Sequence, residues 1–223
     1  MLERRFVPLD ATEIRADGEQ GVIEGHSAMF GIWTDIGPFR ERVEPGAFRD
    51  TIAQDDVRAL FNHDPNMVLG RTSNGTLALE ERQKGLFMRA TPNMDTQVGK
   101  DVTAWVKRGD IKGQSYGFTV LEDSWETKDI EGEAVEHRTV KKVKLFDVGP
   151  VTFPAEEETD VQANSAQAVY ELRQKDLVAH TGGPDGDGDD VTLERDETPL
   201  MTSRGNALAL RERQHLIEKE GSE

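Results

Sequence analysis

The chain has 223 residues, which suit one domain of ordinary size with additional segments, or two small domains. Its formal net charge is −16, from 43 acidic and 27 basic residues, which argues against a general basic surface for nucleic acid or anionic lipid. The sequence contains no cysteine, which excludes disulfides, thiolate zinc sites and cysteine nucleophiles.

The beginning of the sequence shows no targeting segment. The opening residues, MLERRFVPLD, lack the apolar stretch of a signal peptide. No apolar run in the sequence approaches the roughly 20 residues that cross a bilayer. We therefore expect a soluble protein of the cytoplasm, with no membrane contact.

Most of the chain up to about residue 153 has the pattern of β-strands. Alternating apolar residues framed by glycines predict a strand at 21–31, and a second strand is predicted at 57–63. An antiparallel meander with strands in VLGRT, TLALE and LFMRA is expected next, because Asn74-Gly75 is typical of a hairpin turn. Later strands are predicted at 114–122, 134–145 and 146–152.

Two helices are predicted among these strands. A short helix is expected at 45–53, because Pro45 suits the first turn of a helix. A longer helix is expected at 95–110, where Val98, Val102 and Trp105 recur at helical spacing. Capping residues precede this second helix and a glycine can end it.

The negative charge is concentrated after Pro154. Residues 1–154 carry a net charge of −6, whereas residues 155–223 carry −10, from 17 acidic and 7 basic side chains. Within the second region, TGGPDGDGDD has no apolar periodicity and is predicted to be a disordered linker between helices at about 161–178 and 205–219. We therefore divide the chain into a folded domain, 1–154, and an acidic, partly helical and partly disordered tail, 155–223.

His63 is the first candidate for chemistry. It lies in FNHDP at the predicted end of a strand, just before an Asp-Pro turn, where an imidazole at the sheet edge can transfer protons. The other four histidines, in strand-like segments or in the tail, have no comparable setting. The alternative interpretation is a half-buried histidine that is hydrogen bonded to a loop carbonyl.

Ser115, in GQSYGFT, is the candidate nucleophile. On a strand, Ser115 and Gly117 share one face, while Tyr116 and Phe118 share the other. With the aromatic face packed inward, the serine would lie on a face of small residues that a substrate backbone can approach. The alternative is an ordinary polar strand position with glycine bends. The GxSxG motif of α/β-hydrolases does not apply, because a strand follows here instead of a helix.

A nucleophilic serine needs a base and a third group that orients the base. Asp147, in KLFDVGPVTFPA, is the best third member, because an acid at the end of an apolar strand needs a partner; the alternative is a surface aspartate. Glu44, in RVEPGAF, is a weaker competitor that can instead help to cap the short helix. The sequence has no phosphate-binding loop, dinucleotide fingerprint or histidine cluster, so no cofactor and no metal are expected.

Four stretches together resemble the prohead proteases of tailed bacteriophages of the HK97 type. They are, in order, EPGAF (44–48), ALFNHDPNMVLGRT (59–72), VKRGDIKGQSYGF (106–118) and FDVGPVTFPA (146–155). The resemblance runs from about residue 20 to 155, so it identifies most of the first domain as a prohead serine protease domain. The tail from about residue 156 carries no such resemblance.

This resemblance implies a mainly β, α+β fold related to the herpesvirus assembly proteases, a bent antiparallel β-barrel with flanking helices. It also implies a serine endopeptidase in which the histidine precedes the serine and the acid comes last, here His63, Ser115 and Asp147. The third position is commonly glutamate in such phage enzymes, whereas this chain has aspartate.

The implied mechanism makes His63 the general base for Ser115, with Asp147 orienting the imidazole. Backbone N–H groups would bind the oxyanion, and the Val148-Gly149 turn is one candidate for them. The candidate substrate-binding residues are Arg71, Gly113 and Gly117.

The resemblance further implies the partners and the place of action. The expected substrate is the scaffolding segment of the major capsid protein, and also the protease itself, inside the assembling procapsid in the bacterial host cytoplasm. The herpesvirus analogy suggests a homodimer. The acidic tail could tether the enzyme or be cut by it, or it could simply be a solubilising extension. The alternative function is a catalytically silent capsid-assembly or scaffolding protein that keeps the fold as a binding module.

Overall fold

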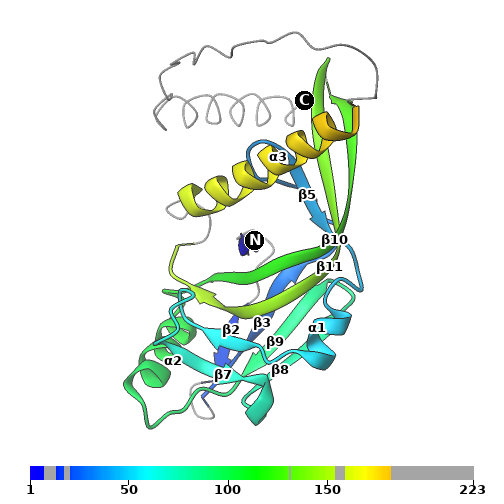
Figure 1. Cartoon of the computed structure of the whole chain (residues 1–223). Helices are drawn as coiled ribbons and strands as arrows, with labels where there is room; N and C mark the ends of the chain where they lie inside the picture. The colour runs from blue at the N-terminus through cyan, green and yellow to red at the C-terminus, as the bar shows by residue number, and fades with distance from the viewer. Residues whose placement is uncertain (8–13, 18–20, 131, 154–158, 182–223) are drawn as a thin grey trace. The chain divides into compact units, whose positions relative to one another are not determined.

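The computed structural model describes residues 1–7, 14–17, 21–130, 132–153 and 159–181, which are coloured in Figure 1. Most of the secondary-structure elements of these residues are strands. They are β1 (Glu3–Phe6), β2 (Arg15–Asp17), β3 (Val22–Met29), β4 (Thr34–Asp35), β5 (Arg40–Val43), α1 (Arg49–Gln54), β6 (Arg58–Leu60), β7 (Val68–Arg71), the 3-10 helix η2 (Thr72–Asn74), β8 (Leu77–Arg82), β9 (Gly85–Ala90), α2 (Gln97–Arg108), β10 (Gly113–Ile130), β11 (Glu133–Val151) and α3 (Thr159–Thr181).

Among the described residues the strands form two sheets. A seven-stranded sheet has the order β1-β10-β11-β5-β4, and β6 and β7 join it through β11. A four-stranded sheet has the order β2-β3-β9-β8. The prediction of a mainly β chain with a few helices is confirmed. Neither sheet closes into a barrel in the described part of the chain, so the herpesvirus-type barrel stays a prediction.

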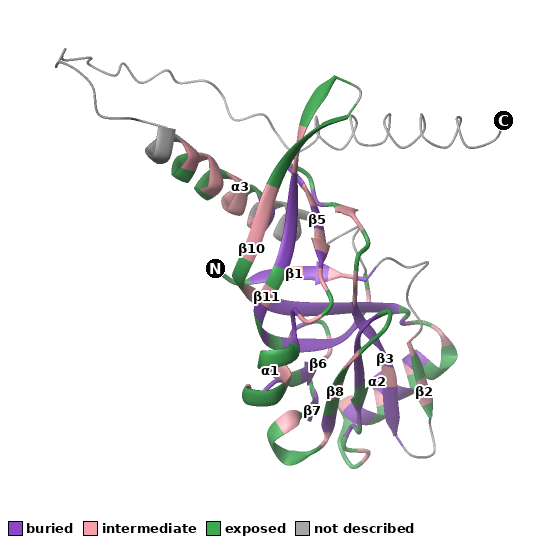
Figure 2. Ribbon diagram, turned by 90° about the vertical axis from the view of Figure 1, so that its right-hand side faces the viewer, coloured by how far each residue is buried: buried purple, intermediate pink, exposed green. Residues whose placement is uncertain are grey.

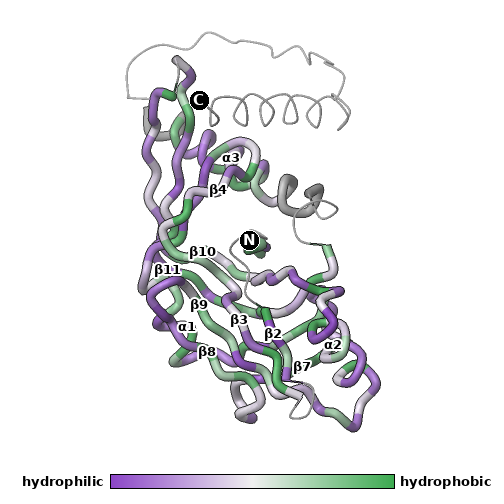
Figure 3. The backbone as a smooth tube through the Cα atoms, turned by 180° about the vertical axis from the view of Figure 1, so that it is seen from behind, coloured by the Kyte–Doolittle hydropathy of each residue, from purple (hydrophilic) through white to green (hydrophobic). Residues whose placement is uncertain are grey.

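β10 and β11 form the longest strand pair. The two strands predicted at 134–145 and 146–152 are one continuous strand, β11, which pairs antiparallel with β10. Register shifts at Gly117/Phe118 and between Val120 and Asp123 mark irregularities of the kind that bend an antiparallel pair. Figure 2 shows that this pair is buried near β1 and exposed toward its hairpin end, where Figure 3 shows many hydrophilic residues.

The second edge of β11 is shared by two short parallel strands. β5 pairs with the part of β11 around Val140, and β6 pairs with it at Asp147 and Val148. Because β6 runs parallel to β11, the residues that follow β6 continue toward the end of β11. This pairing positions the turn that carries His63.

Apolar side chains from both sheets meet in one buried cluster. Phe118 and Leu145 come from the larger sheet and Ile23 and Met88 from the smaller one, each at most 1% exposed. Burying a side chain of this size contributes about 1.5–3 kcal/mol. The cluster therefore accounts for the inward direction of the Tyr116–Phe118 face of β10.

α2 agrees closely with its prediction. The Thr96 hydroxyl accepts a hydrogen bond from the N–H of Gly99 at 3.2 Å, so Thr96 caps the start of the helix. Gly109, with φ of 86°, ends it in the left-handed conformation that glycine adopts without steric cost. Val102 and Val106 are buried against the cluster between the sheets.

The hairpin predicted at Asn74-Gly75 is wrong. β7 belongs to the seven-stranded sheet and β8 to the four-stranded one, so the chain passes between the sheets here. A type I′ turn needs positive φ at both central residues, but only Gly75 has it, with φ of 76°. The Thr72 hydroxyl accepts a hydrogen bond from the N–H of Val57 at 2.9 Å and fixes this crossing.

α3 covers the helix predicted at 161–178. Its Ala166 and Tyr170 pack with Phe39 and Trp125 in a second, smaller apolar cluster. The strands and α3 belong to one compact unit, Met1–Gly182, which continues past Pro154. The predicted linker after Thr181 and the predicted helix at 205–219 lie outside the described residues. None of the described helices is long and apolar enough to span a membrane.

Candidate active site

β10 and β11 bring Ser115 and Asp147 together on one face of the sheet. In the register of the two strands, Ser115 lies opposite Gly149 and Gly117 lies opposite Asp147. Residues that are directly opposite share a face, so the serine and the aspartate project to the same side from adjacent strands. Ser115 is completely buried and Asp147 is 9% exposed.

His63 reaches the same face from the turn after β6. The strand predicted at 57–63 ends at Leu60, and the chain then turns. Asn62 and His63 have φ values of 52° and 55°, in the left-handed region that is costly for residues other than glycine. Such strained backbone is concentrated at functional sites, where the surrounding structure holds it in place.

The three side chains form a continuous hydrogen-bonded chain. His63 Nε2 lies 2.6 Å from Ser115 Oγ, and Nδ1 of the same ring is hydrogen bonded to Asp147 Oδ1. Because an ionised carboxylate can only accept, Nδ1 carries the proton and Nε2 can accept the serine hydroxyl proton. The arrangement therefore allows proton transfer from Ser115 to His63 while Asp147 orients the ring.

Two glycines make this packing possible. A Cβ at Gly117 would lie 2.6 Å from Asp147 Oδ2, so the missing side chain leaves room for the carboxylate. A Cβ at Gly149 would lie 2.0 Å from the carbonyl oxygen of Leu60, so only glycine lets the end of β6 come this close to β11. The free space above Gly117 is thus occupied by Asp147. Gly113 lies opposite Val151 at the start of β10.

Asn62 is a residue of the site that the sequence analysis did not single out. Its side-chain oxygen accepts a hydrogen bond from the N–H of Thr152 at 2.9 Å, and its Nδ2 donates to Thr152 Oγ1 at 3.1 Å. Its own N–H donates to the carbonyl oxygen of Pro150 at 3.1 Å. These bonds tie the turn that carries His63 to the end of β11. Asparagine tolerates the left-handed region, so the pair Asn-His in FNHDP was the available signal.

The main chain of β1 completes the surroundings of Ser115. β1 pairs antiparallel with β10, with Phe6 opposite Ser115, and the Ser115 hydroxyl donates to the carbonyl oxygen of Arg5 at 3.0 Å. A hydroxyl has one proton, so it bonds either to this carbonyl or to His63 Nε2 at a given moment. The sequence analysis placed no strand at residues 3–6 and therefore missed this contact.

The remaining candidates make other contacts than with these three side chains. The Arg71 guanidinium donates hydrogen bonds to Asp56: its Nε lies 2.9 Å from Oδ1 and 2.8 Å from Oδ2 of that carboxylate. Glu44 lies between β5 and α1, where its N–H donates to the carbonyl oxygen of Val140. Val148-Gly149 is part of β11, so the turn predicted there does not form. In the described part of the chain, no group of His, Asp or Glu side chains is arranged to hold a metal ion.

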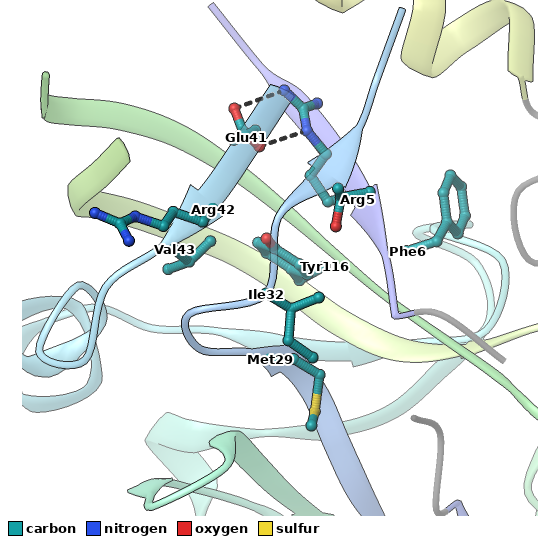
Figure 4. Close-up of a pocket in the computed structure, with 9 residues that line it drawn as sticks. Arg5, Phe6, Met29, Ile32, Glu41, Arg42, Val43 and Tyr116 are labelled. Carbon is teal, nitrogen blue, oxygen red and sulfur yellow. Dashed lines mark hydrogen bonds and ion pairs between the residues drawn. The ribbon is translucent and has the colours of Figure 1, made fainter. Parts of the chain in front are cut away.

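A second buried polar group lies on the opposite face of β10, beside Tyr116. Arg5 Nε is 2.7 Å from Glu41 Oε1, an ion pair drawn with dashed lines in Figure 4. Arg138 Nη1 lies 2.8 Å from Glu3 Oε2 and 3.0 Å from Glu41 Oε2. We call Glu3, Arg5, Glu41 and Arg138 the ion cluster; each side chain is at most 5% exposed.

The electrostatics of the ion cluster keep its two arginines charged. Burial acts to lower the pKa of Arg5, but the charges of Glu41 and Glu3 outweigh it, so the pKa of Arg5 is raised. The pKa of Arg138 is raised by the same two carboxylates against the same opposing burial. Burial first, and Glu41 second, raise the pKa of the Tyr116 phenol, so this group stays neutral.

The chain is similar in sequence to known proteins. A family model described as caudovirus prohead serine protease matches residues 8–173. The chain is 29% identical over 176 residues to the prohead protease of Enterobacteria phage HK97, and the alignment covers 76% of this chain and 72% of that protein. No solved structure matches the chain. Ser115, His63 and Asp147 all fall inside the matched range, which also extends past Pro154 into α3.

Proposed function

The chain belongs to the family of caudovirus prohead serine proteases, and we propose that it is an endopeptidase of procapsid maturation with the triad Ser115, His63 and Asp147. Family membership supports a protease role in capsid maturation. The assignment of the three residues rests on one observation, the hydrogen-bonded chain from Asp147 through His63 to Ser115.

In the proposed mechanism, His63 Nε2 takes the hydroxyl proton of Ser115 as Oγ attacks the carbonyl carbon of the scissile peptide. The imidazolium then gives this proton to the leaving amine, and water hydrolyses the resulting acyl-enzyme by the same steps. Asp147 holds the Nδ1 proton and stabilises the positive charge on the ring. A positioned general base of this kind contributes about 10²–10⁴-fold in rate.

The proposed substrate is the scaffolding segment of the major capsid protein, cleaved inside the assembling procapsid. The name of the HK97 relative, a prohead protease, supports this place of action. We extend the proposal to cleavage of the protease itself and to a homodimer by fold analogy. Kinship with the herpesvirus assembly proteases is part of the same proposal and rests on fold analogy alone.

Co-expression with the cognate capsid protein tests this function. Wild-type protease is expected to shorten the capsid protein, and Ser115→Ala is expected to leave it at full length. Ser73→Ala is the matched control, because Ser73 is exposed in η2, and it is expected to cleave like wild type. Equal lengths of the capsid protein with wild type and Ser115→Ala would instead support the catalytically silent assembly protein.

Mass spectrometry of the purified chain tests self-cleavage. We expect active enzyme to lose part of the region after Pro154, whereas Ser115→Ala keeps its full mass. An active enzyme that retains its full mass would limit the substrate to the capsid protein.

A further inference from the structure

Ser115 is completely covered in this structure. The residue is 0% exposed and the side chain of His63 is 2% exposed. A nucleophilic oxygen must come into contact with the carbonyl carbon that it attacks, so part of the protein must move before a peptide can react. The element next to Ser115 on the open side of its sheet is β1.

β1 lies on β10 as a bound peptide would. It is extended and antiparallel to β10, with Phe6 opposite Ser115. The Val7 N–H donates to the carbonyl oxygen of Gln114 at 2.9 Å, and the Arg5 carbonyl accepts from Ser115 Oγ at 3.0 Å. Adding an extended segment to a sheet edge is a general mode of peptide recognition, in which main-chain hydrogen bonds supply affinity.

The position of β1 in the sheet allows it to leave. β1 is the edge strand of the order β1-β10-β11, and its only strand partner among the described residues is β10. Detaching it therefore breaks no other strand pair and uncovers the backbone of β10 at residues 114–118. An edge with free N–H and C=O groups is a template for another extended chain.

The buried side chains within β1 are charged, whereas Val7, the next residue, is apolar and 2% exposed. Glu3 and Arg5 point into the ion cluster, while Arg4 and Phe6, on the face of Ser115, are only half-buried. Figure 4 shows Arg5 directed toward Glu41 and Phe6 directed away from it. Charged groups regain water when they are released, whereas buried apolar groups would lose their stabilisation. This kind of attachment suits a strand that detaches without unfolding the core.

We propose that β1 occupies the substrate site: a peptide substrate binds as an antiparallel strand on the edge of β10 at residues 114–118, and β1 blocks Ser115 until it is displaced. The inference rests on the proposed function, because it takes Ser115 as the nucleophile. The Arg5 carbonyl also competes with His63 Nε2 for the single Ser115 hydroxyl proton, which adds to the blocking effect of the strand.

A disulfide that locks β1 in place gives a direct test. Glu3 lies opposite Phe118, and the Thr119 hydroxyl donates to the carbonyl oxygen of Met1 at 2.9 Å, so Leu2 faces Thr119 across the strands. The double variant Leu2→Cys/Thr119→Cys would place two thiols at this pair, at a Cβ separation near that of a disulfide. The natural chain has no cysteine, so no other thiol competes.

The measurement is the rate at which a biotinylated fluorophosphonate labels Ser115 in the full-length double variant. We expect the oxidised form to react at least about tenfold more slowly than the reduced form, because labelling proceeds through the open state and the crosslink lowers the population of that state. In the single variants Leu2→Cys and Thr119→Cys, the labelling rate is expected to be the same under oxidising and reducing conditions. Equal rates in the oxidised and reduced forms would overturn the proposal.

Hydrogen exchange of the wild-type chain tests the opening without any catalysis. We expect the amides of residues 3–7 to exchange through a local opening, faster than the amides shared by β10 and β11. If β1 exchanges only with global unfolding, it is a permanent strand and the proposal is wrong. If β1 opens locally but Ser115 is never labelled, the proposed triad fails while the mobile edge strand stands.

Discussion

The two faces of β10 carry two buried polar groups of opposite character. On one face, Ser115, His63 and Asp147 are linked by hydrogen bonds. They fit there because Gly117 and Gly149 have no side chain. On the other face, beside Tyr116, the ion cluster pairs full charges with full charges. The first group has a proton that can pass from the serine to the histidine, whereas the second group is a set of salt bridges.

Because of this difference, we expect the first group to matter for the reaction rate and the second to matter for stability. A buried ion pair adds little net stability, but removing one partner leaves an unpaired buried charge and is strongly destabilising. A serine–histidine–aspartate chain contributes little to stability, yet small displacements within it cost large factors in rate. Substitutions on the two faces should therefore affect different measurements.

The largest effect on stability is expected from Glu41→Gln in the ion cluster. The change leaves Arg5 and Arg138 short of a charge partner, and we expect a loss of about 3–5 kcal/mol in the free energy of unfolding, measured by urea titration. Labelling of Ser115 per folded molecule should not fall, because the cluster holds β1 and not the triad. Glu80→Gln, in an exposed pair with Arg82, is the control and should change stability only slightly. If Glu41→Gln keeps its stability but loses labelling of Ser115, the ion cluster serves the reaction and not stability, which contradicts this prediction.

The opposite outcome is expected from Gly117→Ala. The new Cβ would lie 2.6 Å from Asp147 Oδ2, and moving the carboxylate breaks its bond to His63. We expect kcat to fall about 10²-fold or more while the fold is retained. Gly75→Ala is the control: its Cβ meets open space, but φ of 76° is strained, so it should cost roughly 1 kcal/mol of stability and leave kcat unchanged. Unchanged kcat in Gly117→Ala would show that Asp147 is not needed.

A smaller effect on rate is expected from Asn62→Ala. This change removes two side-chain hydrogen bonds to Thr152 and a residue that tolerates the left-handed backbone before His63. We expect kcat to fall about tenfold, with the same KM, because only the placement of the base changes. Thr152→Val removes one of the two hydrogen bonds, so its kcat should lie between that of Asn62→Ala and that of wild type. If both variants match wild-type kcat, the turn holds His63 without Asn62.

The smallest effect on stability is expected from Asp56→Asn, a substitution on the protein surface. The hydrogen bond from Arg71 holds the pKa of Asp56 well below its usual range. The folded-state pKa is below the unfolded one, so this pair stabilises the protein at neutral pH, and the contribution is lost as the pH falls below about 4. Urea titrations at several pH values should show a slight loss for Asp56→Asn at pH 7 that shrinks in acid. A raised KM in Arg71→Gln, but not in Asp56→Asn, would assign Arg71 to substrate binding.

Local patterns predicted much of the fold. α2 has its capping threonine, its apolar spacing and its final glycine within sixteen consecutive residues, 95–110, and it forms where expected. The hairpin at Asn74-Gly75 failed because turn preference says nothing about which sheet receives the next strand. β11 is one strand where two adjacent strands were predicted, because its pairing with β10 continues through the predicted break between residues 145 and 146.

The candidate site divides in the same way. Ser115, His63 and Asp147 were chosen from short motifs, and the structure brings these three together. Asn62 acts through a backbone conformation and a partner ninety positions along the chain, which a single motif does not reveal. β1 has only four residues, and its ion cluster joins residues 3, 5, 41 and 138, so no local pattern announces it.

The central claim is that Ser115 is a nucleophile activated by His63, and covalent labelling tests it most directly. The protein is treated with a fluorophosphonate, digested, and mapped by mass spectrometry, in wild type and in His63→Ala. We expect one adduct, on Ser115, in wild type and a loss of labelling in His63→Ala. An adduct on a different residue, or equal labelling of Ser115 in both proteins, would contradict it.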